Sequence, residues 1–150
     1  MQKTTTIRIL VVDDNNVVLT SVCRLLTKLG YEAIAAQDGS EALRIMETND
    51  GFNLILTDIN MPQIDGWELA HRIKSIKPDI PIIALTGENP NHILPRLSGS
   101  GISYALSKPF NLDQLNNAIA YILESDWSRQ SKEMAKKRAH VACSNPVRGR

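Results

Sequence analysis

Short aliphatic runs alternate with helical patterns five times along this 150-residue chain. The runs Ile9–Val12 and Leu54–Leu56 contain no polar residue, which is typical of strands buried on both faces of a parallel sheet. Successive parallel strands need a crossover, usually a helix, and these crossovers are right-handed. The alternation therefore predicts one α/β domain, a doubly wound (βα)5 unit with a five-stranded parallel sheet. The strand order 2-1-3-4-5 is expected because it is a known order of such sheets.

The positions of the elements follow from the same alternation and from residues that begin and end helices. The strands are expected at Arg8–Val12, Glu32–Ala36, Leu54–Thr57, Ile82–Thr86 and Ser103–Ser107. The helices are expected at Asn16–Leu29, Gly39–Thr48, Gly66–Ile76, Asn91–Ser98 and Leu112–Glu124. Asp38, Asp65 and Asn111 are predicted N-caps, and Gly30 is predicted to end the first helix.

Charged residues stand where three of the expected strands end. Asp13 and Asp14 follow the first strand, Asp58 follows the third, and Lys108 follows the fifth. The carboxyl ends of parallel strands meet at one edge of the sheet, and ligands bind there in doubly wound folds. We therefore expect three carboxylates and one ammonium group to converge on a single site.

The chemistry of such a cluster is restricted. Adjacent carboxylates repel one another, and at least one becomes protonated unless a cation relieves the repulsion. Oxygen ligands without a nearby His or Cys favour Mg²⁺, which keeps several waters and shares its remaining positions with phosphate oxygens. A carboxylate can also attack phosphorus to form an aspartyl-phosphate. The cluster therefore predicts a phosphoryl-accepting aspartate beside Mg²⁺, with the lysine neutralising a phosphate oxygen.

Each of these residues also has an ordinary structural explanation. An Asp-Asp pair after a strand often caps the next helix, and Lys-Pro is common in surface turns. A hydroxyl at a strand end, such as that of Thr86, can likewise be a helix cap. The order of the motifs favours the site instead: Asp13-Asp14, then Asp58 with Met61-Pro62 and Gly66, then Thr86-Gly87, then Lys108-Pro109-Phe110.

In this order and spacing, Arg8 to Leu123 resemble the receiver domain of two-component response regulators, a flavodoxin-like fold. The resemblance implies that Asp58 is the phosphorylation site and that Thr86 and Lys108 bind the phosphoryl oxygens. The donor would be a phosphohistidine on a sensor histidine kinase or a histidine phosphotransfer protein. Such a receiver is not otherwise an enzyme, because it catalyses only its own phosphorylation and dephosphorylation.

The resemblance also implies a metal site and a backbone feature. Asp14 and Asp58 would bind Mg²⁺ directly, Asp13 would hold a metal-bound water, and Asn60 would contribute its backbone carbonyl. The peptide bond between Lys108 and Pro109 would be cis, which costs little before proline and would direct the ammonium group inward.

Two positions depart from the pattern of the family. Receivers usually carry Tyr or Phe three residues before the lysine, where this chain has Ala105. The neighbouring Tyr104 cannot replace that ring, because successive strand residues face opposite sides. Pro95 falls inside the fourth expected helix, which should therefore be short, shifted or mobile. His92 in the same segment is expected to be an exposed helix residue, since no partner with ligand spacing is visible.

Charge separates the receiver, residues 1–125, from a basic C-terminal tail, residues 126–150. The first range has ten Lys and Arg against fourteen Asp and Glu, a balance of −4, and the second has seven against two, a balance of +5. The tail is expected to be part helical, over Trp127 to Ala139, and part disordered, over Ser144 to Arg150. A basic helix could contact nucleic acid, a membrane surface or an acidic partner. A solvated tail is favoured, because seven cations with Trp127 as the only aromatic residue are weak evidence for such binding. Output is expected through protein contacts, with a homodimer as one candidate.

Composition is compatible with a cytoplasmic domain. The 43% hydrophobic content is sufficient for one core. Cys23 and Cys143 suggest no disulfide framework. There is no long apolar span, and residues 1–6 are too short and polar for a signal peptide.

Three other classes of protein remain as alternatives. An aspartate-based phosphohydrolase would form the same aspartyl-phosphate, but the common arrangement has a second acid two residues after the nucleophile, where this chain has Asn60. A flavin-binding or purely structural doubly wound domain would need neither the carboxylates nor the Lys-Pro. A pseudo-receiver that docks partners without being phosphorylated would retain the same fold.

Overall fold

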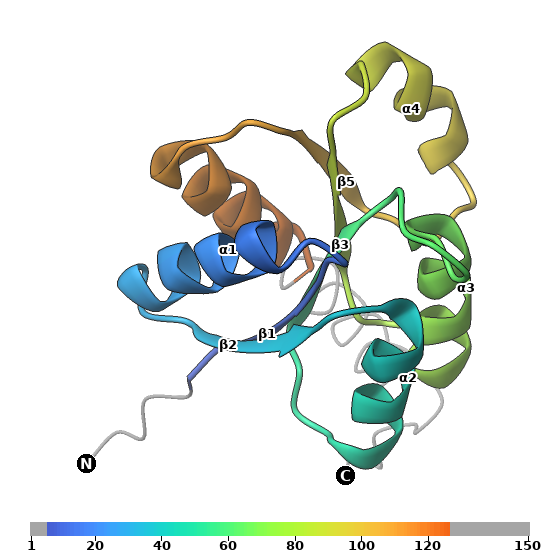
Figure 1. Ribbon diagram of the computed structural model, residues 1–150, viewed down its shortest axis with the longest axis horizontal. Helices are drawn as coiled ribbons and strands as arrows, with labels where there is room; N and C mark the ends of the chain where they lie inside the picture. Colours follow the sequence, from blue (N-terminus) through green and yellow to red (C-terminus); the bar gives the residue numbers. More distant parts are fainter. Residues whose placement is uncertain (1–5, 127–150) are drawn as a thin grey trace, which may run out of the picture.

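Strands and helices alternate through residues 6–126, which are the residues that the computed structural model describes (Figure 1). The elements are β1 (Arg8–Val12), α1 (Asn16–Lys28), β2 (Glu32–Ala36), α2 (Gly39–Thr48), β3 (Leu54–Asp58), α3 (Gly66–Ile76), β4 (Ile82–Thr86), α4 (Pro90–Leu97) and β5 (Tyr104–Ser107). A final helix is described over residues 112–126. The strands pair in parallel in the order β2-β1-β3-β4-β5. The predicted fold class and strand order are both confirmed.

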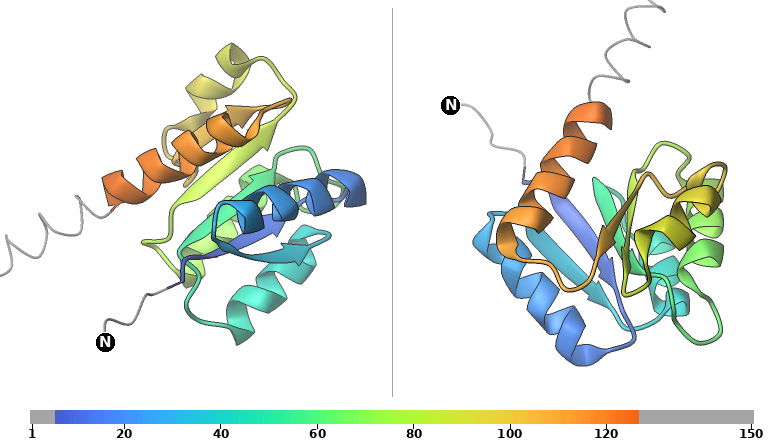
Figure 2. Two further views of the ribbon diagram at one scale, coloured as in Figure 1. Left: turned by 90° about the vertical axis from the view of Figure 1, so that its left-hand side faces the viewer. Right: turned by 90° about the horizontal axis from the view of Figure 1, so that it is seen from above.

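Helices cover both faces of the sheet. Leu10 and Ile55 pack on the face covered by α2, α3 and α4, whereas Val11 and Leu56 pack on the face covered by α1 and the final helix. Figures 1 and 2 show the two helical layers on either side of the sheet. All four of these side chains are fully buried. This two-sided burial explains why the central strands contain uninterrupted aliphatic runs.

The element boundaries agree with the sequence prediction to within two residues. The differences are that α1 ends at Lys28, β3 extends to Asp58, α4 covers Pro90–Leu97, β5 begins at Tyr104, and the final helix reaches residue 126. The predicted caps are also confirmed: Asp38 and Asp65 accept hydrogen bonds from the backbone amides of Glu41 and Glu68, and Asn111 accepts one from Gln114. Gly30 has a φ of 91° and directly follows Leu29, the C-cap of α1.

The fourth helix is short, as Pro95 predicts. It has 8 residues, against 10 to 13 in α1, α2 and α3. Pro95 lacks the amide hydrogen that would continue the helical hydrogen bonds, and the helix ends two residues later at Leu97. Pro90 stands at the first turn, where an amide hydrogen would have no intrahelical partner.

Tyr104 and Ala105 face opposite sides of the sheet, as expected. Ala105 packs with the cluster that includes Ile93 of α4. Tyr104 packs on the other face, with its ring centroid 6.0 Å from that of Tyr121 in the final helix. The side of β5 that faces α4 therefore carries a methyl group where the family usually has an aromatic ring.

Two sequence predictions concern residues that are not described. The basic tail lies beyond residue 126, apart from Asp126 itself, so its partial helix and disorder stay predictions, and the same is true of Cys143. Within residues 6–126, none of the helices has the length and apolar character needed to cross a membrane.

Candidate functional site

The parallel sheet brings the predicted site residues to one edge. Asp13 follows β1, Asp58 is the last residue of β3, and Thr86 is the last residue of β4. Because β3 lies between β1 and β4, these three strand ends are neighbours. Carboxylate oxygens of Asp13, Asp14 and Asp58 all lie within 4.8 Å of one another. The predicted convergence of the three carboxylates is therefore present in the structure.

The ammonium group of Lys108 contacts two of these carboxylates. Its Nζ lies 3.1 Å from Oδ2 of Asp13 and 3.3 Å from Oδ1 of Asp58. Its backbone amide donates to the carbonyl of Thr86 at 2.7 Å, which fixes the lysine beside the end of β4. The peptide bond between Lys108 and Pro109 is cis, as the family resemblance implies.

The structure also tests the ordinary explanation of the acidic pair as a helix cap. The N-cap of α1 is Asn15, whose side chain accepts from the amides of Val17 and Val18. Asp13 accepts from the amide of Asn15 at 2.9 Å and otherwise pairs with Lys108. Among residues 6–126, no group makes a hydrogen bond or ion pair with the exposed Asp14 carboxylate. Asp14 is therefore free to bind a cation.

Asp58 has a buried carboxyl group, and the charge of Lys108 offsets only part of the cost of ionising it there. Only 9% of the residue is exposed, and Oδ1 accepts from the amide of Ile59 at 2.9 Å. Burial raises the pKa of the Asp58 carboxyl, an effect that Lys108 opposes and that the Asp13 charge reinforces. A divalent cation beside Asp58 would favour its ionised form.

This raised pKa predicts that Asp58→Asn increases the free energy of unfolding of the metal-free protein at pH 7. A carboxyl group with a higher pKa in the folded state contributes stability at low pH, and that contribution is lost as the pH rises through the folded-state pKa. The advantage of the variant should therefore disappear near pH 3, below the usual pKa of about 3.9. Urea unfolding with a chelator at both pH values measures this difference, and a variant no more stable than the wild type at pH 7 would contradict it.

Thr86 and Asn60 are linked by a residue that the sequence analysis missed. The backbone amide of Glu88 donates to Oγ1 of Thr86 at 3.0 Å, and Nδ2 of Asn60 donates to Oε1 of Glu88 at 3.1 Å. The helix cap of α4 is Asn89 rather than Thr86. Glu88 therefore connects the loop after β4 with the loop after β3. Its position two residues after Thr86 was the only sequence signal for this role.

Gly66 lets the start of α3 approach the site closely. Its amide donates to the carbonyl of Ile59 at 2.8 Å. A Cβ atom at position 66 would lie 2.5 Å from the carbonyl oxygen of Asp58 and 2.8 Å from Cα of Ile59. Both of these atoms belong to the backbone and cannot turn aside, so a glycine is required for α3 to begin directly behind Asp58.

The donor set fits Mg²⁺. It offers carboxylate oxygens of Asp13, Asp14 and Asp58 within 4.8 Å of one another, and Mg²⁺ prefers oxygen ligands. Within the described part of the chain, the backbone carbonyl of Asn60 makes no hydrogen bond, so it also has a free acceptor. The net negative charge of the three carboxylates and Lys108 favours binding of a divalent cation.

A doubly wound sheet with three carboxylates and a lysine at its carboxyl edge defines a receiver-type α/β domain. The sequence model of the response regulator receiver domain matches residues 9–120, and the chain belongs to that family. Receiver domains of two-component systems generally accept phosphoryl groups and bind Mg²⁺ at an acidic pocket, and they have no catalytic activity beyond their own phosphorylation.

Two relatives show the range of proteins in which such a domain occurs. The chain is 40% identical over 116 residues to the CAI-1 autoinducer sensor kinase/phosphatase CqsS of Vibrio cholerae, an alignment that covers 75% of this chain and 17% of CqsS. It is 38% identical over 111 residues to the response regulator MprA of Mycolicibacterium vanbaalenii, covering 73% of this chain and 47% of MprA. The chain thus spans less than half the length of either relative.

Solved structures match the fold over most of the described residues. The chemotaxis protein CheY4 of Vibrio cholerae has a TM-score of 0.73 at 30% identity, covering 78% of this chain and 98% of CheY4. The response regulator TrrA of Thermotoga maritima, solved in complex with Mg(2+)-BeF, has a TM-score of 0.71 at 34% identity, covering 78% and 99% of the two chains.

Proposed function

We propose that this domain accepts a phosphoryl group from a phosphohistidine donor onto Asp58 and signals through contacts with other proteins. The observation that carries the proposal is the position of Lys108, with Nζ 3.1 Å from Asp13 and 3.3 Å from Asp58. A phosphoryl group on Asp58 would place its oxygens near this ammonium group, which would offset their charge. Thr86, at the end of the adjacent β4, has a hydroxyl that could donate to another phosphoryl oxygen.

The proposed reaction is a direct transfer between two protein side chains. A carboxylate oxygen of Asp58 attacks the phosphorus atom of the phosphohistidine, the P–N bond breaks, and the released imidazole nitrogen takes up a proton. Asp13, Asp14, Asp58 and the carbonyl of Asn60 would hold Mg²⁺. When bound, this ion would neutralise charge on the phosphoryl oxygens and favour their approach to the carboxylates.

A sensor histidine kinase or a histidine phosphotransfer protein is the proposed donor. This assignment is supported by the relatives, which include a sensor kinase and a response regulator. Phosphoryl transfer from such a donor to Asp58 would take place in the cytoplasm, which contains the ATP that phosphorylates histidine kinases.

Incubation with acetyl phosphate and Mg²⁺, followed by intact-mass measurement, tests the proposal. A phosphoryl acceptor should gain one adduct of about 80 Da, which should be absent when a chelator removes Mg²⁺. A pseudo-receiver would gain no adduct under either condition. Release of phosphate from acetyl phosphate does not separate a receiver from an aspartate-based phosphohydrolase, because a receiver also hydrolyses its own aspartyl-phosphate. A phosphohydrolase should instead turn over a phosphate monoester such as p-nitrophenyl phosphate, a poorer phosphoryl donor than acetyl phosphate, and a receiver should not.

The loop after β4 and helix α4 should carry the response to phosphorylation. Ala105 has no ring that could move. The hydroxyl oxygen of Thr86, in contrast, accepts a hydrogen bond from the backbone amide of Glu88 at the start of this loop. A conformational change requires contacts that differ between the two states, and Thr86 would gain one with a phosphoryl oxygen. Phosphorylation, or a beryllofluoride mimic, should therefore change amide exchange mainly across Gly87 to Leu97, with little change at Tyr104. Exchange changes centred on Tyr104, with Gly87 to Leu97 unaffected, would contradict this expectation.

Ala105→Tyr tests this expectation, because it restores the aromatic ring that receivers usually carry at this position. Ala105 packs against the cluster that contains Ile93, so the new ring would be added on this side of β5. It should alter partner affinity or dimerisation more than the rate of phosphorylation by acetyl phosphate.

A further inference from the structure

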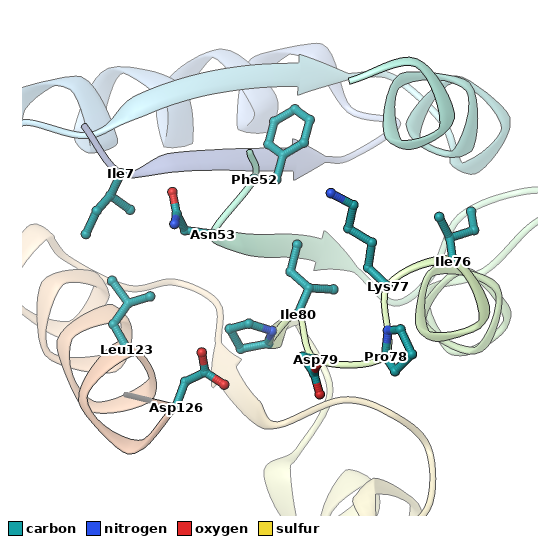
Figure 3. Close-up of a pocket in the computed structure, with 11 residues that line it drawn as sticks. Ile7, Phe52, Asn53, Ile76, Lys77, Pro78, Asp79, Ile80, Leu123 and Asp126 are labelled. Atoms are coloured by element: carbon teal, nitrogen blue, oxygen red, sulfur yellow. The ribbon is translucent and has the colours of Figure 1, made fainter. Parts of the chain in front are cut away.

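A groove of about 670 Å³ lies at the edge of the sheet opposite the acidic site. Its lining comes from the segments that enter β1, β3 and β4, from the end of α3, and from the final helix (Figure 3). The lining residues are Ile7, Phe52, Asn53, Ile76, Lys77, Pro78, Asp79, Ile80, Pro81, Leu123 and Asp126. Most of these side chains are apolar, and they belong to parts of the chain far from the proposed phosphorylation site.

Hydrogen bonds hold the walls of this groove in place. The amide of Asn53 donates to the carbonyl of Arg8 at 2.8 Å, and the Asn53 side chain accepts from the amide of Arg8 at 2.9 Å. Nζ of Lys74 donates to the carbonyl of Pro78 at 3.2 Å and to that of Ile80. The groove is therefore formed before anything binds in it, which lowers the entropy lost on binding.

The groove offers an apolar surface with an exposed carboxylate, that of Asp79, among its lining residues. Ile76, at the end of α3, is one of the large aliphatic residues left exposed, at 39%. Lys77 is paired with Asp50 at 3.0 Å, which compensates its charge. Asp79 is exposed and makes no ion pair within residues 6–126. An occupant that combines an apolar side chain with positive charge would therefore fit this surface.

The sequence that directly follows the described residues has this composition. Trp127 comes next after Asp126, which lines the groove, and stands four positions after Leu123, which also lines it. Residues four apart lie on the same side of a helix, so a continued helix would direct Trp127 toward the groove. Residues 127–150 contain seven Lys and Arg and one acidic residue, Glu133.

We propose that the segment beginning at Trp127 binds in this groove, with the indole ring on the apolar lining around Ile80 and Leu123 and its cations near Asp79. Indole is large and mostly apolar, so covering it and the groove removes a substantial area from water. The tail is covalently attached at the rim, so it binds at a high effective concentration. The basic tail is then anchored to the acidic receiver rather than held free in solvent.

Tryptophan fluorescence tests this proposal in the full chain. The chain has two tryptophans, Trp67 and Trp127, so Trp67→Phe leaves Trp127 as the single tryptophan. In that background, Trp127 should show blue-shifted emission and severalfold weaker quenching by acrylamide than in the urea-unfolded chain. Ile76→Arg, which places a cation at the groove, should restore strong quenching. The matched control is Leu94→Arg, at another exposed aliphatic residue, on α4, and it should leave quenching weak.

Three outcomes would overturn the proposal. Trp127 could be as accessible to acrylamide in the folded chain as in the unfolded chain. It could be shielded but insensitive to Ile76→Arg, which would place it on another surface. Its shielding could also disappear on dilution, which would show that the tail of a second copy occupies the groove. Shielding that is independent of concentration and sensitive only to the groove variant is the supporting result.

Discussion

Asp58→Asn is expected to abolish phosphorylation of this domain by acetyl phosphate and Mg²⁺. The variant keeps the size of the side chain and can still accept a hydrogen bond from the amide of Ile59, but its amide is not a nucleophile toward phosphorus. Intact mass should show an adduct of about 80 Da on the wild type and none on the variant.

The control for this experiment removes a similar charge elsewhere. Asp38 is the exposed N-cap of α2, and asparagine caps helices about as well as aspartate does. Asp38→Asn should therefore be phosphorylated like the wild type. Equal adducts on the wild type and on Asp58→Asn would show that Asp58 is not the acceptor.

Asp14→Ala is expected to weaken Mg²⁺ binding by more than tenfold, which corresponds to about 1.4 kcal/mol or more. Asp14 is the exposed member of the three-carboxylate cluster, and it has no competing partner among residues 6–126. Its replacement should therefore remove a direct ligand while the bonds of Asp13 and Asp58 to Lys108 persist.

A Mg²⁺ titration that follows Trp67 fluorescence can measure this loss, with Trp127→Phe removing the other tryptophan. Trp67 follows Gly66, the residue at which α3 meets the backbone of Asp58, and its ring is stacked under Arg96 at 4.3 Å. Glu47→Ala, on the exposed face of α2, removes one negative charge away from the cluster and should leave the affinity nearly unchanged. Equal Mg²⁺ affinity in Asp14→Ala and the wild type would rule out the proposed ligand set.

Much of the fold could be predicted because local patterns and burial agree along this chain. Aliphatic runs such as Leu54–Leu56 predicted buried parallel strands, and Asp38 and Asp65 marked the starts of α2 and α3. The strand order was taken from the known order of such sheets, because pairing between strands distant in sequence leaves no local signal. The convergence of the charged side chains could be predicted for a related reason: in a parallel sheet, residues that end strands meet at one edge whatever the details of packing.

Only the tertiary structure decided which side chains pair at the carboxyl edge of the sheet. It also decided that a groove lies at the opposite edge. Lys108 contacts Asp13 across 95 positions of sequence, and Asn60 contacts Glu88 across 28. The groove near Ile76 and Leu123 likewise joins segments from both ends of the described chain. Such contacts depend on where whole strands and helices pack, so no spacing or periodicity around Glu88 or Ile76 encodes them. The sequence by itself determined the elements and the kind of chemistry at their ends, whereas long-range packing decided the individual partners.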